Sequence, residues 1–178
     1  MSLSLLMPAF VLKNFIGVQN KVVIFHKSLG KITCVYTNRE IAAKLCTGSL
    51  IYCSVERQRS YYSFAQVHVD YVPLACSLST LSLIHDIVRI CWHLLPAKIA
   101  VHELFDFLLY VYKHIESLSL LGQKVVLLRM FLLFDVLPHN PGIYLCARKD
   151  PYASITESEI ELQKYILQCW SKFDQEIS

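Results

Sequence analysis

Basic and aromatic side chains are interleaved through the first part of this 178-residue chain. Residues 1–74 hold eight Lys or Arg and three Asp or Glu, a net charge of +5. The eight are Lys13, Lys21, Lys27, Lys31, Arg39, Lys44, Arg57 and Arg59. Aromatic residues in the same stretch include Tyr36, Tyr52, Tyr61, Tyr62 and Phe64. Cations neutralise phosphates and rings stack on unpaired bases, so the pattern is compatible with nucleic-acid binding. The competing interpretation is that the lysines solvate edge strands while the tyrosines fill a small core.

Motifs for catalysis or metal binding are not found in the sequence. His102-Glu103 is not followed by a second histidine at the spacing of a metal-binding helix. The seven cysteines include no Cys-x-x-Cys pair, which favours reduced, mostly buried thiols over zinc ligands or disulfides. The chain also has no glycine-rich phosphate loop and no Gly-x-Ser-x-Gly motif. We therefore expect no catalytic residue, no metal and no cofactor, and we predict that the protein is not an enzyme.

Strand patterns precede helical ones along the chain. Strands are predicted at residues 10–16, 22–25, 32–36, 50–55 and 61–69, and a short helix at 39–45, capped by Asn38, lies between the third and fourth. This order predicts a five-stranded OB-type barrel, although any small Greek-key barrel shares it. Residues 71–74 would form the hinge to a helical part, so we expect an α+β protein with domains at 1–74 and 75–178.

Helical periodicity extends through most of the remaining chain. Long helices are predicted at residues 81–95, 103–115 and 125–137. The third is apolar almost all round, which predicts a buried helix, and Asn140-Pro141-Gly142 would end it. Thr156 and Glu159 have the spacing of a capping box for a last helix. Apolar residues at helical spacing in that helix predict that it closes a helical bundle.

The apolar runs are too interrupted by charge to span a bilayer. Asp86, Asp106 and Arg129 lie within the best candidates. The opening residues have neither the basic segment nor the cleavage site of a signal peptide. We therefore expect a cytoplasmic protein without a membrane partner.

Several short patches, in the right order between residues 9 and 146, resemble the RecO family of bacterial recombination mediators. In the predicted barrel they are Ala9-Phe10-Val11-Leu12-Lys13 and Leu29-Gly30-Lys31-Ile32. In the predicted helices they are Leu94-Leu95-Pro96, residues 102–109 and residues 128–138. The resemblance implies DNA repair and recombination after DNA damage: binding of single- and double-stranded DNA, strand annealing, and recombinase loading together with a RecR-like protein.

The resemblance also implies a peptide partner for the helical part. The family docks the acidic, apolar C-terminal tail of single-stranded-DNA-binding protein there, which requires an apolar pocket with a basic rim. Candidates for the rim are Arg89, Lys113 and Arg129, and Lys98 is a further one. For Arg129, a structural ion pair with Asp106 or Asp135 is an equally good interpretation.

Two departures from the family pattern leave a second function open. Only Cys146 remains near the position where many members carry a four-cysteine zinc module, so we expect a short, zinc-free form. The basic cluster that follows the third strand in many members is reduced to Arg39 and Lys44. The alternative to a RecO-like mediator is therefore a protein–protein adaptor of the same fold with little DNA binding.

Overall fold

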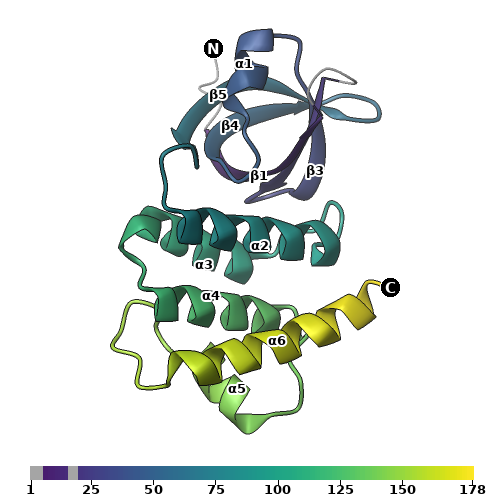
Figure 1. Cartoon of the computed structure of the whole chain (residues 1–178). Coiled ribbons are helices and arrows are strands. Elements are labelled where there is room, and N and C mark those ends of the chain that lie inside the picture. Colours follow the sequence, from purple (N-terminus) through teal and green to yellow (C-terminus); the bar gives the residue numbers. More distant parts are fainter. Residues whose placement is uncertain (1–5, 16–19) are drawn as a thin grey trace. The chain divides into compact units, whose positions relative to one another are not determined.

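The computed structural model describes residues 6–15 and 20–178, with the side chain of Arg39 left out (Figure 1). The chain forms two compact units. The barrel unit consists of Met1–Cys76 and Leu95–Asp106, and the helical unit of Ser77–Leu94 and Phe107–Ser178. The boundary falls within one helix, α3 (His102–Lys113), whose first turns belong to the barrel unit.

Five strands close into a barrel, which confirms an α+β fold with an N-terminal barrel followed by helices. They are β1 (Met7–Phe15), β2 (Lys21–His26), β3 (Gly30–Val35), β4 (Leu50–Arg57) and β5 (Tyr62–Tyr71). Their order around the barrel is β1-β2-β3-β5-β4. Only the β3–β5 pairing among them is parallel, and it joins Cys34 to Tyr62 and Val35 to Ser63. Every strand therefore has a neighbour on both sides, although β3 and β5 meet over only these two residue pairs.

The barrel core follows the alternation of apolar side chains along the strands. Val11, Ile24 and Ile32 are paired across β1, β2 and β3 and point to the same interior. The short helix α1 (Arg39–Lys44) begins as predicted, because the side chain of Asn38 accepts a hydrogen bond from the backbone of Glu40 at 2.8 Å. Leu45, at the end of this helix, is fully buried in the core.

Residues 95–106 pack against the outside of the barrel within the same unit. The ring of Phe105 lies 5.0 Å from that of Phe10 and 5.1 Å from that of Phe25. Gly30 has a φ of 70°, and a Cβ there would overlap the backbone of Ile99. Glycine is therefore required at this turn by both its conformation and the close approach of the chain. These contacts cover the outward face of the β2–β3 hairpin near its turn.

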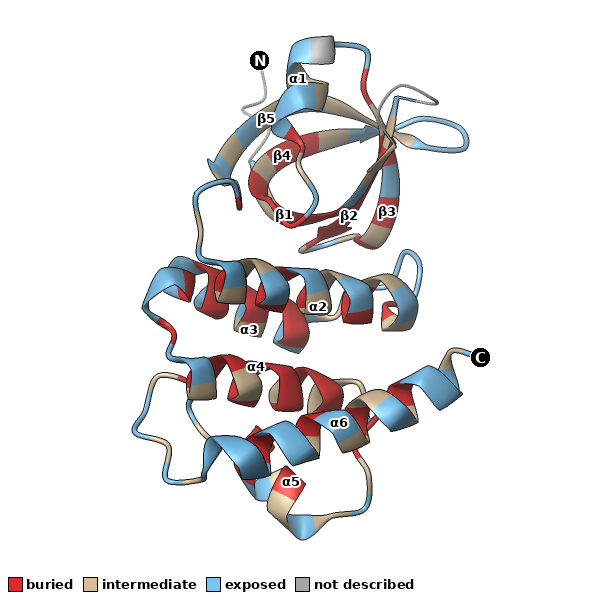
Figure 2. Ribbon diagram, in the orientation of Figure 1, coloured by how far each residue is buried: buried red, intermediate tan, exposed pale blue. Residues whose placement is uncertain are grey.

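The helical unit is built around α4 (Leu120–Leu133), which packs against α2 (Leu78–Leu94), α5 (Pro141–Ala147) and α6 (Glu159–Glu176). Figure 2 shows that α4 is mostly buried, whereas α6 has one buried and one exposed face. A short 3-10 helix, η1 (Ile115–Ser117), follows α3. No helix in the described ranges is both long and apolar enough to cross a bilayer.

Three helix boundaries differ from the sequence-based predictions. The helix predicted at 125–137 begins earlier, where Ser119 caps α4, and it ends at Leu133 before Asp135, which has a φ of 56°. Asn140 does not end that helix but caps α5, a helix that the sequence analysis missed. The cap of α6 is Ser158, whose hydroxyl accepts a hydrogen bond from the backbone of Glu161 at 3.2 Å, and not Thr156.

Candidate nucleic-acid interface

The strand register gathers basic residues at one end of the barrel. Lys21 begins β2 opposite Val35 of β3, and Val35 pairs with Ser63 of β5. Arg57, the last residue of β4, pairs with Tyr62. Lys21 is therefore two strand spacings, about 10 Å, from the start of β5, although more than thirty residues separate them in the chain.

The turn between β4 and β5 projects from this end of the barrel, and we call residues 57–62 the hairpin tip. The tip contains Arg57, Arg59 and Tyr61, all of them exposed. The backbone N–H of Gln58 donates to the carbonyl of Tyr61 at 2.8 Å, and the amide of Gln58 donates to the hydroxyl of Ser63 at 3.2 Å. The hairpin tip is therefore an ordered turn anchored to the barrel by the pairing of Tyr62 with Cys34.

The helix α1 brings a further cation to the same end. The amide of Asn14 donates to the carbonyls of Ala42 and Leu45, at 3.1 and 2.9 Å, and so holds the end of α1 against β1. Lys44, which is exposed on this helix, therefore lies at the same end of the barrel as Lys13 of β1. We call Lys13, Lys21, Lys44, Arg57 and Arg59 the basic end. Glu40 and Glu56 are exposed in the same region and offset two of its five charges.

Most cations of the basic end lack a carboxylate partner. Among the residues that the structure describes, no ion pair is formed by Lys21, Lys44, Arg57 or Arg59. The ammonium group of Lys13 lies 5.1 Å from the centre of the Phe15 ring, a cation–π contact. Unpaired surface cations give the region a positive potential that attracts anions and depends on salt.

Two of the predicted DNA-binding lysines lie elsewhere on the barrel. Lys27 forms an ion pair with Asp106 at 2.9 Å. The carbonyl of Lys31 accepts a hydrogen bond from the backbone of Lys98 at 3.0 Å, beneath residues 95–106. Lys27 lies in the β2–β3 turn and Lys31 near the start of β3, at the opposite ends of these strands from Lys21. The side chain of the remaining candidate, Arg39, is outside the described part.

The five aromatic residues that could stack on bases also differ in how far they are buried. Tyr36 is buried, and its hydroxyl donates to Oδ1 of Asn14 at 3.0 Å, so this side chain is part of the barrel core. Tyr62 and Phe64 pack partly against the barrel core, and Tyr52 is half-buried. Tyr61 is the exception, with 45% of its surface exposed. The core-filling interpretation thus applies to Tyr36, Tyr62 and Phe64 but not to Tyr61.

Burial shifts the pKa values of one histidine and two cysteines in the barrel toward their neutral forms. Burial lowers the pKa of His26, whose Nδ1 accepts a hydrogen bond from the backbone of Ser28 at 3.2 Å. Burial raises the pKa of the Cys53 thiol to about 12, and the pKa of Cys34 is raised by burial and by Cys53. His26, Cys34 and Cys53 therefore add no charge to the barrel at neutral pH.

The three residues predicted to bind a partner peptide have separate surroundings in the helical unit. Arg89 lies over the ring of Trp170 at 4.6 Å and pairs with Asp174 at 2.7 Å. Arg129 lies over the ring of Phe107 at 5.1 Å, and the described residues give it no ion pair with Asp135. Lys113 is exposed at the end of α3. None of the three residues lines the cavity that lies between α2, α4 and α6.

A cavity of about 300 Å³ lies between α2, α4 and α6. Its apolar wall includes Leu83, Leu127 and Trp170, and its polar wall includes Asp86 and Lys124. Burial raises the pKa of Asp86, although Arg89 and His85 oppose this shift. Lys124 donates to the amide oxygen of Gln163 at 2.7 Å and lies 3.7 Å from a carboxylate oxygen of Glu159. No sequence pattern predicted this cavity, because its lining comes from three helices far apart in the chain.

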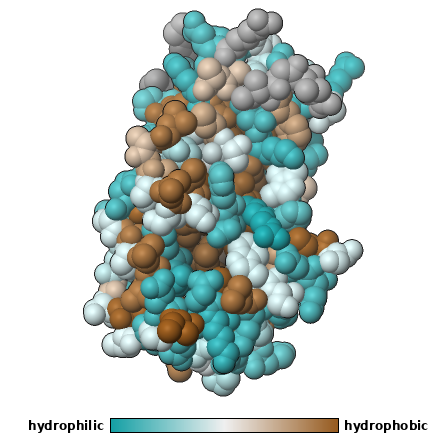
Figure 3. All heavy atoms as spheres, viewed as in Figure 1, coloured by the Kyte–Doolittle hydropathy of each residue, from teal (hydrophilic) through white to brown (hydrophobic). Residues whose placement is uncertain are grey.

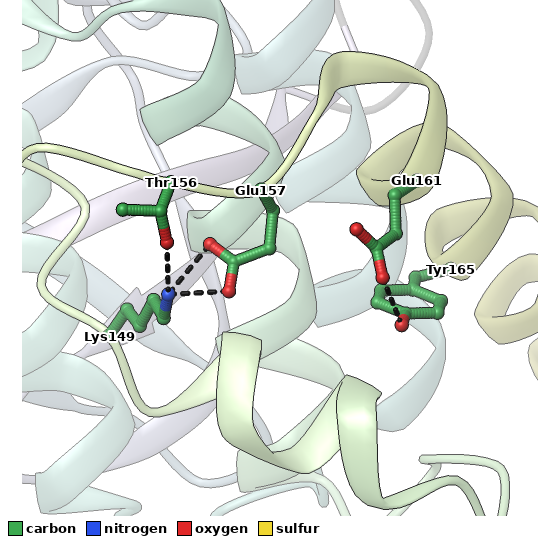
Figure 4. Close-up of polar contacts among 5 residues, drawn as sticks. All are labelled: Lys149, Thr156, Glu157, Glu161 and Tyr165. Atoms are coloured by element: carbon green, nitrogen blue, oxygen red, sulfur yellow. Dashed lines mark hydrogen bonds and ion pairs between the residues drawn. The ribbon is translucent and has the colours of Figure 1, made fainter.

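A polar cluster between α5 and α6 is structural in character (Figure 4). Lys149 donates to both carboxylate oxygens of Glu157, at 2.6 Å for Oε2, and to the hydroxyl of Thr156 at 3.4 Å. The hydrogen bonding from Lys149 is the main reason that the pKa of Glu157 lies below its usual value. Tyr165 donates separately to Glu161 at 2.8 Å. The paired charges of Lys149 and Glu157 therefore fasten the loop before α6.

The exposed face of α6 carries two apolar side chains that line the same shallow hollow. Ile160 and Leu167 are 83% and 60% exposed. On the face of the molecule in Figure 3, hydrophobic residues are interspersed with hydrophilic ones and do not merge into one continuous patch. Single exposed apolar residues are normal on soluble surfaces and require no partner.

The described residues contain no group of three His, Cys, Asp or Glu side chains placed to hold a metal ion. Comparison of the sequence with protein-family models and with curated proteins finds no match.

Proposed function

We propose that the barrel is of the OB type and binds nucleic acid without catalysis. Its closed order β1-β2-β3-β5-β4, with α1 between β3 and β4, supports the OB assignment. OB barrels bind oligonucleotides with the surface of strands 2 and 3 and with loops that include the one between strands 4 and 5. The hairpin tip is that loop in this protein, and Lys21 belongs to the second strand.

The observation that carries this proposal is the unpaired charge at the basic end. Four cations there have no carboxylate within ion-pair distance among the described residues, whereas Lys27 is neutralised by Asp106. Phosphates would supply the missing counter-charges, and the bound counterions that they release would drive association. The two exposed carboxylates reduce the charge and point to moderate affinity.

Taken with the sequence resemblance, these features lead us to propose a zinc-free, RecO-like mediator in the bacterial cytoplasm. In this role it would bind single- and double-stranded DNA, bring complementary strands together for repair and recombination, and act with a RecR-like protein. No bond is made or broken in such work, so binding surfaces are sufficient. The helical unit would then serve as a bundle that contacts protein partners.

The test is a salt titration of DNA binding with two matched triple variants. Lys21, Arg57 and Arg59 changed to Ala should weaken binding and flatten the plot of log affinity against log salt by about 2, at about 0.7 for each phosphate contact on single strands. The control variant changes Lys113, Arg148 and Lys164, which are exposed in the helical unit, and removes the same charge. If both variants change the slope equally, the effect is net charge and the barrel is not the site. If the parent protein does not bind DNA, the adaptor function replaces the mediator function.

We propose a second function for the helical unit, the docking of an acidic, apolar peptide tail at the 300 Å³ cavity. Lys124 lies in its wall, and Arg89 contacts Trp170, which also lines it. A peptide ending in Asp-Asp-Asp-Ile-Pro-Phe should bind there, and Lys124→Ala should weaken it more than Arg129→Ala. Equal binding by the parent and the Lys124 variant would exclude the cavity.

A further inference from the structure

The side chain of Tyr61 is exposed without a visible structural role. No described residue forms a hydrogen bond, an ion pair or a ring contact with its side chain, and 45% of its surface is open to solvent. Tyr36, by comparison, is buried and hydrogen-bonded in the same barrel. Exposure alone is common for a single aromatic residue. The position of Tyr61 in the hairpin tip, among the cations of the basic end, makes its exposure relevant to ligand binding.

The backbone beneath Tyr61 is fixed before any ligand binds. Its carbonyl accepts the 2.8 Å hydrogen bond from Gln58 that closes the hairpin tip. The next residue, Tyr62, is paired on one side with Arg57 and on the other with Cys34. A ring on an ordered turn loses little conformational freedom on binding, so more of the contact energy appears as affinity.

Cations lie close to Tyr61 in the chain and across the neighbouring strands. Arg57 and Arg59 precede it in the hairpin tip, and both are exposed and without an ion-pair partner among the described residues. Lys21 lies two strands away, at the level of Ser63. Phosphates held by these cations would bring a base to the ring of Tyr61.

We infer that Tyr61 makes this site selective for single-stranded nucleic acid, by stacking on one unpaired base. The inference rests on the proposed nucleic-acid binding and names its preferred ligand. In a duplex both faces of each internal base are already covered by neighbouring bases, so the ring gains nothing there. Arg57, Arg59 and Lys21 contact the phosphates of single strands and duplexes alike, whereas stacking on the ring strengthens the binding of single strands only.

The first experiment compares Tyr61→Leu with Tyr61→Phe, using oligothymidine and a duplex of equal length at one fixed salt concentration. Tyr61→Leu should weaken oligothymidine binding by about 5- to 150-fold, the usual contribution of one stacked base, and change duplex binding less than about twofold. Tyr61→Phe should keep the affinity of the parent, because it keeps the ring. Tyr110→Leu is the matched control, since Tyr110 is 43% exposed but lies in the helical unit.

A second experiment reports the ring–base contact directly. In the Tyr61→Trp variant, stacking of a base on the indole should quench its fluorescence when oligothymidine is added, and duplex should quench it much less. Trp92 and Trp170 provide the background, which the parent protein measures. A quench with oligothymidine in the variant and not in the parent supports the contact.

The outcomes separate this inference from the proposed function. If Tyr61→Leu binds both ligands like the parent, or weakens both equally, single-strand selection by Tyr61 is wrong, even where the Lys21, Arg57 and Arg59 triple variant shows that the barrel binds DNA. If the parent binds neither ligand, the proposed function fails first. A melting temperature for each variant excludes loss of folding as the cause.

Discussion

The ammonium nitrogen of Lys27 lies 2.9 Å from Oδ1 of Asp106, a residue 79 positions further along the chain. This pair joins the β2–β3 hairpin to the start of α3 within the barrel unit. It also removes one of the eight basic residues of the N-terminal part from the set available to an anionic ligand.

Lys27→Ala should therefore affect DNA binding much less than Lys21→Ala. Lys21 is unpaired among the described residues, so its loss should lower the salt slope by about 0.7, whereas the loss of Lys27 should leave the slope near that of the parent. The partly exposed pair should contribute no more than about 1 kcal/mol to folding. Salt titrations of both variants measure the slopes, and an equal reduction in both would place Lys27 in the interface.

Phe105→Ala should strongly destabilise the barrel unit. The side chain is fully buried between Phe10 and Phe25, so its removal leaves a cavity and should cost about 3–5 kcal/mol in free energy of unfolding. Phe107→Ala is a useful comparison, because that ring is only partly buried and should cost less. Urea unfolding of the two variants measures the difference, and similar losses would contradict the packing of residues 95–106.

Ser158→Ala should destabilise α6, and Thr156→Ala should do so much less. Ser158 accepts a hydrogen bond from the backbone of Glu161, and loss of such a cap costs about 1 kcal/mol. Thr156 contributes only a long hydrogen bond, at 3.4 Å, to Lys149. Thermal unfolding of the two variants decides between the caps, and a larger effect at Thr156 would restore the helix start predicted from the sequence.

The pair formed by Lys149 and Glu157 should make stability depend on acid pH. The pKa of Glu157 is lower in the folded chain than in the unfolded chain, chiefly because Lys149 donates hydrogen bonds to it. Its stabilising effect is therefore complete above the unfolded pKa, usually about 4.5, and is lost as pH falls through the lower folded pKa. Lys149→Met should reduce stability at pH 7 by up to about 1 kcal/mol, and the difference from the parent should shrink below pH 4.5. A difference that persists at pH 2 would mean that Lys149 stabilises the loop by packing alone.

The cysteines should react with a thiol reagent in two groups. Cys46 and Cys76 are partly exposed, whereas the other five are buried. The pKa of Cys169, like that of Cys53, is raised by burial to about 12, so only about one thiol in ten thousand would be ionised at pH 8. Mass spectrometry after brief labelling of the native protein should find Cys46 and Cys76 modified first. Early labelling of Cys53 would show that the barrel opens readily.

Local sequence patterns predicted much of the barrel and part of the helical unit. Alternating apolar residues placed the strands, because side chains in a strand point to opposite faces in turn. Asn38 marked the start of α1, because a cap is made by residues that are neighbours in the chain. The helix boundaries near Thr156 and Asn140 were misplaced, because capping residues recur a few positions apart and only packing selects among them.

The sequence by itself determined the number and order of the strands and the charge of the N-terminal part. The tertiary structure alone decided which of those charges lie together. Closure of the barrel through Cys34 and Tyr62 brings Lys21 level with the hairpin tip, whereas Lys27, at the other end of β2, is paired with Asp106. Such pairings join residues far apart in the chain, so they depend on the packing of the whole unit and leave no periodic signal in the local sequence.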